Sequence, residues 1–396
     1  MLLMTALAAL LALPLFLPTL ADLVSLLVAP LRRTRPRRLA APTEREPRLL
    51  FLIPAHNEEL LLARTLRSVR AMDYPLDRVH CIVIADNCDD RTADVARAEG
   101  VECLDRQSER ERGKPYAIRW ALDRIDLSRH DAVVVLDADS FVNPEFARCI
   151  AARGPVRAKV IQPFGDVSNP TENALTRMSA VFSVARFVYM NGLKAPSGLN
   201  VPLVNGTVFG SDVLSTHGWP AFSITETWEM YALLTARGVR IECAPDAHTY
   251  SQEARSLAQS GPQRRRWGAG KLWVLLHTSR AILGSRAIGW HQKLDAMGEL
   301  IALGPVVHTA LAACLLALTW WMSPPGGGVI VLLLALSIAR QVAYAMLATA
   351  SVAEPWSAAR AFLYLPIYAL WRVALQLRIF ASVNAGNWVR TSRHAE

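Results

Sequence analysis

The stretch AVVVLDADS, Ala132 to Ser140, places an unbroken apolar run directly before two carboxylates that lie one residue apart. Such a run is typical of a central parallel strand, because both faces of that strand are buried. Asp137 and Asp139 then fall where the strand leaves the sheet. Ligands of open α/β sheets bind at the carboxyl ends of the strands, and two carboxylates there suit a divalent cation that holds a phosphate. A simple turn is the alternative for this motif alone.

The surrounding sequence predicts an α/β domain. Short β-branched runs alternate with helical stretches, so strands are expected at 49–53, 80–85 and 131–136, and helices at 58–72, 93–99 and 116–125. This order implies right-handed crossovers and a parallel, Rossmann-like sheet.

An apolar segment precedes this domain. From Leu2 to Val28 the only charged residue is Asp22, and about 20 apolar residues suffice to cross a bilayer. A cleaved signal peptide is the competing interpretation, but the segment has no basic n-region and is followed at once by LRRTRPRR. The positive-inside rule then predicts that the amino-terminal end lies outside and that Arg32 onward lies in the cytoplasm.

Apolar segments also follow the domain. Residues 300–322 and 329–350 are each long enough to span a membrane. Residues 358–383 carry three arginines and either span the membrane or lie along its surface. We therefore expect one amino-terminal and two to three carboxyl-terminal transmembrane helices. Arg340 is costly in lipid and is expected to be functional or paired, and Glu354 is a candidate partner only if the helix ends nearby.

Charge and cysteine content narrow the function. The net charge of +9 comes largely from arginine-rich stretches that border apolar ones, which suits anionic lipid head groups and phosphorylated substrates. No motif for binding nucleic acid is present, so no such partner is expected. The six cysteines show no C-x-x-C spacing, and neither a zinc site nor a disulfide framework is indicated.

Polar motifs follow the other predicted strands. FLIPAHNEE, residues 51–59, ends the first strand, and IVIADNCDD, residues 82–90, ends the second. Asp86 is placed to accept a hydrogen bond from a nucleobase, whereas Asp90 is explained by the start of the next helix. RGKPYAIRWAL puts Lys114 just before a helix, where an ammonium can meet phosphate.

The motif QRRRW combines an amide, dense positive charge and an indole. Arg266 can pair with a diphosphate, and Trp267 can stack on a sugar. A basic helix beside the membrane is the alternative for this segment by itself.

In order along the chain, PAHNEE, ADNCDD, GK, D-x-D and Q-x-x-R-W resemble the motifs of the membrane-bound family 2 glycosyltransferases, which include cellulose, hyaluronan and poly-N-acetylglucosamine synthases and ceramide glucosyltransferase. The resemblance implies a GT-A fold, inverting transfer from a UDP-sugar donor, and Mg²⁺ or Mn²⁺ at the D-x-D motif. It implies these roles: donor binding by Pro54, Glu58, Asp86, Lys114 and Asp137, metal binding by Asp139 with Asp137, and diphosphate or acceptor contacts by Gln263, Arg266 and Trp267. NGTVFGSDVL, residues 205–214, resembles the segment that lines the acceptor side.

One position departs from the family pattern. The family usually has T-E-D, whose aspartate is the general base, and this chain has Thr227 in that place. Threonine cannot serve as the base. Glu226, or Glu229 about one helical turn on, can supply the carboxylate, because a base needs only reach and a suitable pKa. A cap for the following helix is the structural alternative for Glu226, and His248 is a further candidate base.

The expected organisation is an amino-terminal transmembrane helix (1–30), a basic juxtamembrane linker (31–44), a GT-A catalytic domain (45–262), the Q-x-x-R-W segment with interfacial helices (263–298) and a carboxyl-terminal transmembrane region (299–396). We expect an inverting glycosyltransferase at the cytoplasmic face of the inner membrane, acting on a lipid or glycan hydroxyl and in contact with membrane lipids. The alternatives are a processive polysaccharide synthase, which would need an oligomer or an export partner, and a non-catalytic scaffold, which only Thr227 favours.

Overall fold

The computed structural model describes residues 2–31 and 46–381, so the arginines from Arg32 to Arg38 lie outside the described residues. The described chain forms two compact units. The sheet unit comprises 46–169 and 201–253, and the helical unit comprises 2–31, 170–200 and 254–381. The domain limits expected from the sequence stay a prediction.

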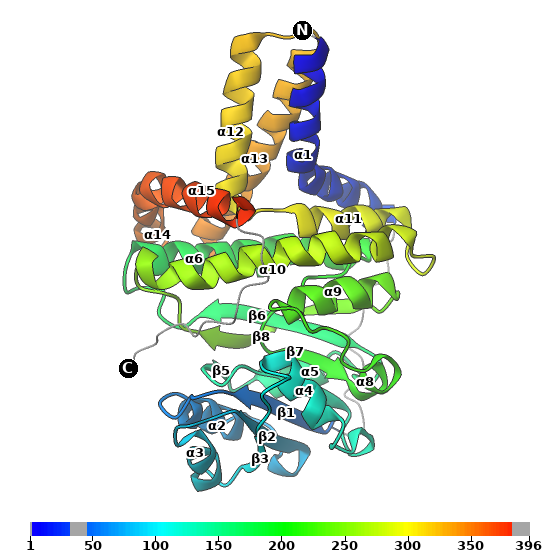
Figure 1. Cartoon of the computed structure of the whole chain (residues 1–396), viewed down its shortest axis with the longest axis vertical. Coiled ribbons are helices and arrows are strands. Elements are labelled where there is room, and N and C mark those ends of the chain that lie inside the picture. The colour runs from blue at the N-terminus through cyan, green and yellow to red at the C-terminus, as the bar shows by residue number, and fades with distance from the viewer. Residues whose placement is uncertain (1, 32–45, 382–396) are drawn as a thin grey trace. The chain divides into compact units, whose positions relative to one another are not determined.

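The sheet unit is built on one eight-stranded sheet (Figure 1). Its strands are β1 (Leu49–Ala55), β2 (Val79–Asp86), β3 (Glu102–Arg106), β4 (Ala132–Val135), β5 (Ser140–Val142), β6 (Val160–Val167), β7 (Thr207–Gly210) and β8 (Ile241–Ser251). Their order across the sheet is β3-β2-β1-β4-β7-β6-β8-β5.

The predicted parallel arrangement is confirmed for β1 to β4. β1 pairs in parallel with β2 and with β4, and β2 pairs in parallel with β3. Every residue of β1 is buried, which explains its unbroken apolar run. The sheet as a whole is mixed, because β7 runs antiparallel to β4 and to β6, and β5 runs antiparallel to β8. The alternation of strand and helix from which a parallel sheet was expected ends at β4.

Short helices complete the sheet unit: α2 (Leu62–Arg70), η1 (Leu76–Arg78), α3 (Thr92–Ala98), α4 (Lys114–Leu122), η2 (Leu127–Arg129), α5 (Phe146–Ala151), α8 (Ser211–His217) and α9 (Glu226–Ala236). Phe51 of β1, Leu62 and Leu66 of α2 and Phe146 of α5 pack into one fully buried core. This core fixes the ends of β1 and β4, from which the candidate site is built.

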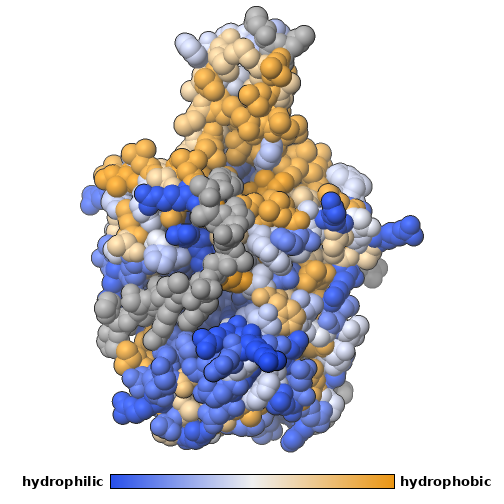
Figure 2. Space-filling view, viewed as in Figure 1, coloured by the Kyte–Doolittle hydropathy of each residue, from blue (hydrophilic) through white to orange (hydrophobic). Residues whose placement is uncertain are grey.

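The helical unit comprises α1 (Leu2–Leu31), α6 (Ala174–Val184), the π-helix η3 (Ala185–Met190), α7 (Asn191–Ser197), α10 (Leu257–Gly284), α11 (Trp290–Ile301), α12 (Pro305–Met322), α13 (Gly327–Ser351), α14 (Pro355–Ala361), η4 (Phe362–Tyr364) and α15 (Leu365–Ala381). α1, α12 and α13 pack side by side, and α15 packs crosswise against one end of α12 (Figure 1). On the face shown in Figure 2, hydrophobic residues cover most of the bundle formed by α1, α12 and α13.

Four segments of the described chain are long and apolar enough to cross a membrane: Leu3–Pro30, Pro305–Met322, Gly327–Ser351 and Pro355–Ile379. One is amino-terminal and three are carboxyl-terminal, as the sequence predicted. The last of them is not one continuous α-helix, because the 3₁₀ turn η4 separates α14 from α15.

The charge inside α13 is neutralised by a residue distant in sequence. Arg340 pairs with Asp22 of α1 at 2.5 Å between Nε and Oδ2, and the Tyr344 hydroxyl donates to the same oxygen at 2.8 Å. Glu354 instead pairs with Arg177 at 2.8 Å. Arg340 is therefore paired, but its partner is Asp22 and not the candidate Glu354. Two largely shielded charges that meet in this way avoid the cost of a lone charge in an apolar bundle.

Candidate functional site

Two strained asparagines mark the ends of β1 and β2. Asn57 and Asn87 have φ angles of 57° and 52°, a left-handed conformation that asparagine tolerates better than most residues. The side-chain carbonyl of Asn57 accepts from the backbone N–H of Asp89 at 3.0 Å, and that of Asn87 accepts from Ser108 at 2.8 Å. These bonds hold the two loops at the carboxyl edge of the parallel strands.

Asp86 lies at the end of β2 with its carboxylate already paired. Its Oδ1 accepts from Nη1 of Arg106 at 2.5 Å and from Nδ2 of Asn87 at 3.0 Å. Arg106 is the register partner of Asp86 on β3. Neither β3 nor Arg106 was predicted from the sequence, although a basic residue in ECLDR, the run after α3, was the available signal.

The loop after β1 holds the other candidates of the PAHNEE motif. Pro54 is buried inside β1, opposite Ile84 of β2. The backbone N–H of Glu58 donates to the Thr92 hydroxyl at 2.7 Å. Asp90 accepts from the backbone N–H of Thr92 at 2.9 Å, which confirms that this aspartate serves the start of α3.

Lys114 joins two predicted site residues that are distant in sequence. Its Nζ lies 2.6 Å from Oδ1 of Asp137 and 2.9 Å from Oε1 of Glu226. Burial lowers the pKa of Lys114, but the two carboxylates outweigh burial and raise that pKa above its ordinary value, so the side chain is an ammonium. The structure therefore brings together a predicted donor-binding residue, a predicted metal ligand and a predicted base.

Lys114 and Glu226 line one pocket of the sheet unit. Asn205, Thr207 and Thr227 line the same pocket, together with apolar residues of β4, β7 and α9. A carboxylate at position 227 would therefore face the same pocket as the carboxylate of Glu226. The position at which the sequence resemblance expects an aspartate therefore lines this pocket, although the residue is a threonine.

The two other candidate bases have structural partners. Oε2 of Glu229 accepts from the backbone N–H groups of Phe222 and Ser223 at 2.8 and 2.6 Å, so it holds the loop before α9. Nδ1 of His248 lies 3.1 Å from Oδ2 of Asp166. Among the candidates, Glu226 alone is joined to the D-x-D motif through Lys114 in the described sheet unit.

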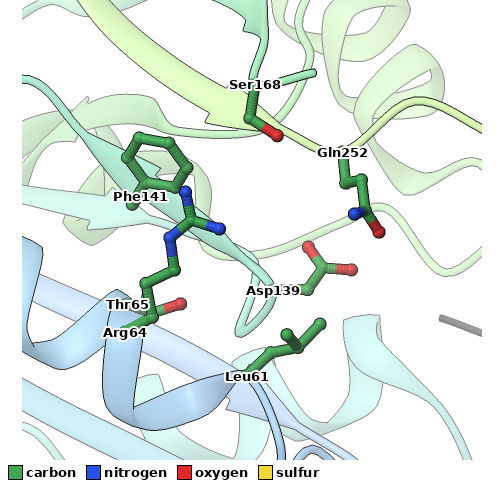
Figure 3. A pocket seen from close by; sticks show the side chains of 7 residues that line it. All are labelled: Leu61, Arg64, Thr65, Asp139, Phe141, Ser168 and Gln252. Atoms are coloured by element: carbon green, nitrogen blue, oxygen red, sulfur yellow. The ribbon is translucent and has the colours of Figure 1, made fainter. Parts of the chain in front are cut away.

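Asp139 faces a second pocket of the sheet unit. Figure 3 shows its carboxylate, the guanidinium of Arg64 and the amide of Gln252 turned toward the same space. The Arg64 guanidinium lies 4.2 Å from the centre of the Phe141 ring, which fixes its direction. Arg64 and Gln252 were not predicted from the sequence, because neither belongs to a recognisable motif.

Asn205 holds the turn that carries the two aspartates. Its carbonyl oxygen accepts from the backbone N–H of Asp137 at 2.8 Å, and its Nδ2 donates to the Ser140 hydroxyl at 2.7 Å. The Ser140 hydroxyl also donates to Oδ1 of Asp139 at 3.0 Å. The NGTVFGSDVL segment therefore supports the D-x-D turn directly.

The two carboxylates at this turn suit a divalent cation that takes its remaining ligands from a substrate and from water. Within residues 2–31 and 46–381, no group of three or more His, Cys, Asp or Glu side chains could hold a metal by itself. Asp137 and Asp139 offer carboxylate oxygens, which Mg²⁺ and Mn²⁺ prefer. Magnesium commonly takes one or two carboxylates and completes its shell with substrate phosphates and water.

The Q-x-x-R-W residues lie on α10 in the helical unit, whereas Asp86, Lys114 and the D-x-D motif belong to the sheet unit. Within the helical unit α10 packs on α15: a side chain at Gly268 would meet Ile379 at 2.6 Å. Trp267 is 42% exposed, so its indole is accessible. The roles of Gln263, Arg266 and Trp267 stay predictions.

Comparison with known proteins gives consistent results. Residues 47–270 match the family model described as "Glycosyltransferase like family 2". The chain is 26% identical over 243 residues to the probable glycosyltransferase YdaM of Bacillus subtilis, covering 58% of this chain and 56% of that protein. It is 23% identical over 290 residues to a beta-monoglucosyldiacylglycerol synthase of Synechocystis, covering 71% of this chain and 59% of that protein. The chain thus spans less than two thirds of the length of either relative.

Among solved structures, the fold is similar to that of the mannosyltransferase PcManGT from Pyrobaculum calidifontis, solved in complex with GDP-Man and Mn²⁺. The TM-score is 0.54 at 17% sequence identity, and the match covers 94% of this chain and 97% of the other. At this identity the likeness concerns the fold.

Proposed function

Because the chain belongs to glycosyltransferase family 2, we propose that this transferase moves a sugar from a UDP-sugar to a hydroxyl of a membrane lipid or a lipid-linked glycan, with inversion at the anomeric carbon. The observation that carries the proposal is the Lys114 bridge. It joins Asp137, a candidate ligand of the donor and its metal, to Glu226, a candidate base, at 2.6 and 2.9 Å. An inverting transfer needs a donor site and one base side by side.

The donor site would use residues at the ends of β1, β2 and β4. Asp86, fixed by Arg106, accepts from a base N–H of uracil. Lys114 donates to the diphosphate. Asp137 and Asp139 would hold Mg²⁺ or Mn²⁺, which would neutralise charge on the leaving diphosphate. The choice of UDP over other nucleotides is supported by the family resemblance of the sequence motifs.

Glu226 is the proposed general base. It accepts the proton of the acceptor hydroxyl while that oxygen forms a bond to the anomeric carbon, and the bond from this carbon to the diphosphate oxygen breaks. The leaving UDP takes the electron pair of that bond, and the Lys114 ammonium offsets the charge that develops on it. Glu229 is the weaker candidate, because two backbone N–H groups already occupy its Oε2.

A lipid acceptor is supported by two observations. The described chain has four helical segments that are long and apolar enough to cross a membrane. The Synechocystis relative is named as the synthase of a glycolipid. We place the sheet unit on the cytoplasmic side, as the five arginines from Arg32 to Arg38 predict by the positive-inside rule.

Turnover assays on the full chain in detergent test the proposal. UDP-glucose, UDP-N-acetylglucosamine, UDP-galactose and UDP-glucuronate are each supplied with Mn²⁺ and membrane lipid extract, and released UDP and lipid products are measured by mass spectrometry. We expect one donor to give a glycolipid whose formation falls about 10²- to 10⁴-fold in Glu226→Gln. Glu242→Gln, a carboxylate change elsewhere in the sheet unit, is the control. UDP release that does not depend on lipid would contradict the lipid acceptor. Unchanged turnover in Glu226→Gln would contradict the role of Glu226 as the base.

A further inference from the structure

The site holds one ammonium between two carboxylates before any donor arrives. Lys114, the first residue of α4, contacts Asp137 after β4 and Glu226, the first residue of α9. The side chains of Lys114, Asp137 and Glu226 are 25%, 36% and 11% exposed, so the ion pairs are partly to largely shielded from water. Shielded pairs of this kind are stronger than surface salt bridges.

This arrangement conflicts with the roles of both carboxylates in catalysis. While Oε1 of Glu226 accepts from Lys114, that oxygen is not available to the proton of an acceptor hydroxyl. Oδ1 of Asp137 is likewise occupied by Lys114 and not available to a cation. The same lysine is the group best placed to meet the donor's diphosphate, and it has one charge to share among three anionic partners.

A diphosphate can compete successfully for this lysine. It presents several anionic oxygens in one place, and the lysine stem is flexible, with three donors that can be redirected. Lys114 also lines the pocket beside Glu226, so its ammonium is within reach of a ligand that enters there. The two carboxylates and one ammonium leave the group with a net charge of −1, which opposes a diphosphate that arrives without a cation.

We propose that Lys114 is an exchangeable counter-ion: it neutralises Glu226 and Asp137 in the donor-free protein, and the donor's diphosphate takes it from both carboxylates, so that donor binding itself exposes the base and the metal ligand. The inference rests on the proposed function, because it concerns the regulation of the same site. It requires the nucleoside diphosphate and the cation to bind together, since each removes an obstacle to the other.

A double-variant cycle measured by binding tests the exchange. The affinity of UDP with Mn²⁺ is determined by calorimetry for the full-length wild type, Lys114→Met, Glu226→Gln and the double variant. Glu226→Gln removes one of the two competitors for Lys114, so we expect it to tighten UDP binding about 3- to 30-fold in the wild-type background. In the Lys114→Met background the same change should have at most a marginal effect, because there is no lysine to release.

Controls separate the exchange from general charge effects. Lys159 and Glu242 lie 4.0 Å apart in the same unit and form the matched pair, whose variants should leave UDP affinity unchanged. Uridine, which lacks the diphosphate, should bind all four proteins alike. If Lys114→Met is unstable, Lys114→Arg replaces it: an arginine keeps the counter-ion, so Glu226→Gln should still tighten binding there.

Two results would overturn the exchange. Equal tightening by Glu226→Gln with and without Lys114 would show simple repulsion between Glu226 and the ligand. Unchanged or weaker UDP binding in Glu226→Gln would show that Lys114 never leaves this carboxylate. Turnover is read separately. A Glu226→Gln protein that shows the coupling but keeps full activity supports the exchange and contradicts the role of Glu226 as the base. A Glu226→Gln protein that loses activity without showing the coupling supports the base and contradicts the exchange.

Discussion

The carboxylate of Asp86 and the guanidinium of Arg106 form a buried ion pair, with 2.5 Å between Oδ1 and Nη1. The two residues are 5% and 3% exposed and are register partners on β2 and β3. A second bond, from Nη2 of Arg106 to the backbone carbonyl of Glu111 at 2.7 Å, ties the loop before α4 to the same arginine. The proposed uracil contact is therefore fixed in place before a nucleotide binds.

Loss of Arg106 should destabilise the sheet unit strongly. Arg106→Met leaves Asp86 as a buried charge without its counter-ion, which typically costs about 3–5 kcal/mol. Asp86→Asn combined with Arg106→Met removes both charges and should recover a substantial part of that loss. Thermal unfolding of the detergent-solubilised chain measures both. Equal stability of the single and double variants would show that the pair contributes little beyond packing.

Asp139→Ala should abolish the effect of Mn²⁺ on UDP affinity without unfolding the protein. The aspartate lies in a turn and faces a pocket, so its loss removes a proposed metal ligand and no core contact. Calorimetry with UDP, with and without Mn²⁺, measures the change. Asp77→Ala, whose side chain is 77% exposed, is the control. A variant whose UDP affinity still rises with Mn²⁺ would remove Asp139 from the metal site.

The parts of this fold that the sequence predicts are those with unbroken apolar runs. β1, β2 and β4 were predicted to within two residues of each observed end, because buried parallel strands need apolar residues on both faces. β3 was not predicted because ECLDR is a short edge strand with charged residues at both ends. It therefore lacks the unbroken apolar run by which a buried strand is recognised. The mixed half of the sheet was not predicted, because between β6 and β7 the chain contributes α6, η3 and α7 to the helical unit, which interrupts the simple alternation of strand and helix.

The sequence predicted the individual residues of the candidate site, but it did not predict which of them contact one another. Lys114, Asp137 and Glu226 were each named from local motifs, but their meeting at 2.6 and 2.9 Å depends on β4, α4 and α9 folding against one another. Asn205 was named only as part of the segment that resembles the acceptor side, and its contact with Asp137 depends on the pairing of β7 with β4. The partner of Arg340 was not predicted for the same reason, because the pairing of α13 with α1 is a tertiary contact.

Thr227→Asp tests how well the natural site is served by Glu226. Position 227 lines the pocket that Lys114 and Glu226 also line, so an aspartate there restores the usual carboxylate of the family. If Glu226 is well placed, we expect less than a twofold change in turnover. The double variant Glu226→Gln with Thr227→Asp should turn over at least tenfold faster than Glu226→Gln alone. No rescue in the double variant would argue that position 227 cannot reach the acceptor hydroxyl.

Gly206 should be essential for the geometry of the D-x-D turn. Its φ of 78° is a conformation that other residues rarely adopt, and a Cβ at this position would lie 2.2 Å from Cγ2 of Thr249. Gly206→Ala therefore has to move β8 or the neighbouring Asn205, which holds Asp137 and Ser140. We expect a loss of about 1–3 kcal/mol in stability and at least a tenfold loss of Mn²⁺-dependent UDP affinity.

A second substitution separates the clash from the backbone strain at Gly206. Thr249→Ser removes Cγ2 and keeps the hydroxyl that donates to the carbonyl of Phe164 at 3.2 Å. In the Gly206→Ala background it should restore most of the UDP affinity, while the cost of the positive φ, about 1 kcal/mol, remains in the unfolding free energy. If Thr249→Ser restores neither quantity, the clash is not what displaces Asn205. If Gly206→Ala alone binds UDP and Mn²⁺ normally, the turn does not depend on this glycine, and the support of Asp137 by Asn205 is not limiting for metal binding.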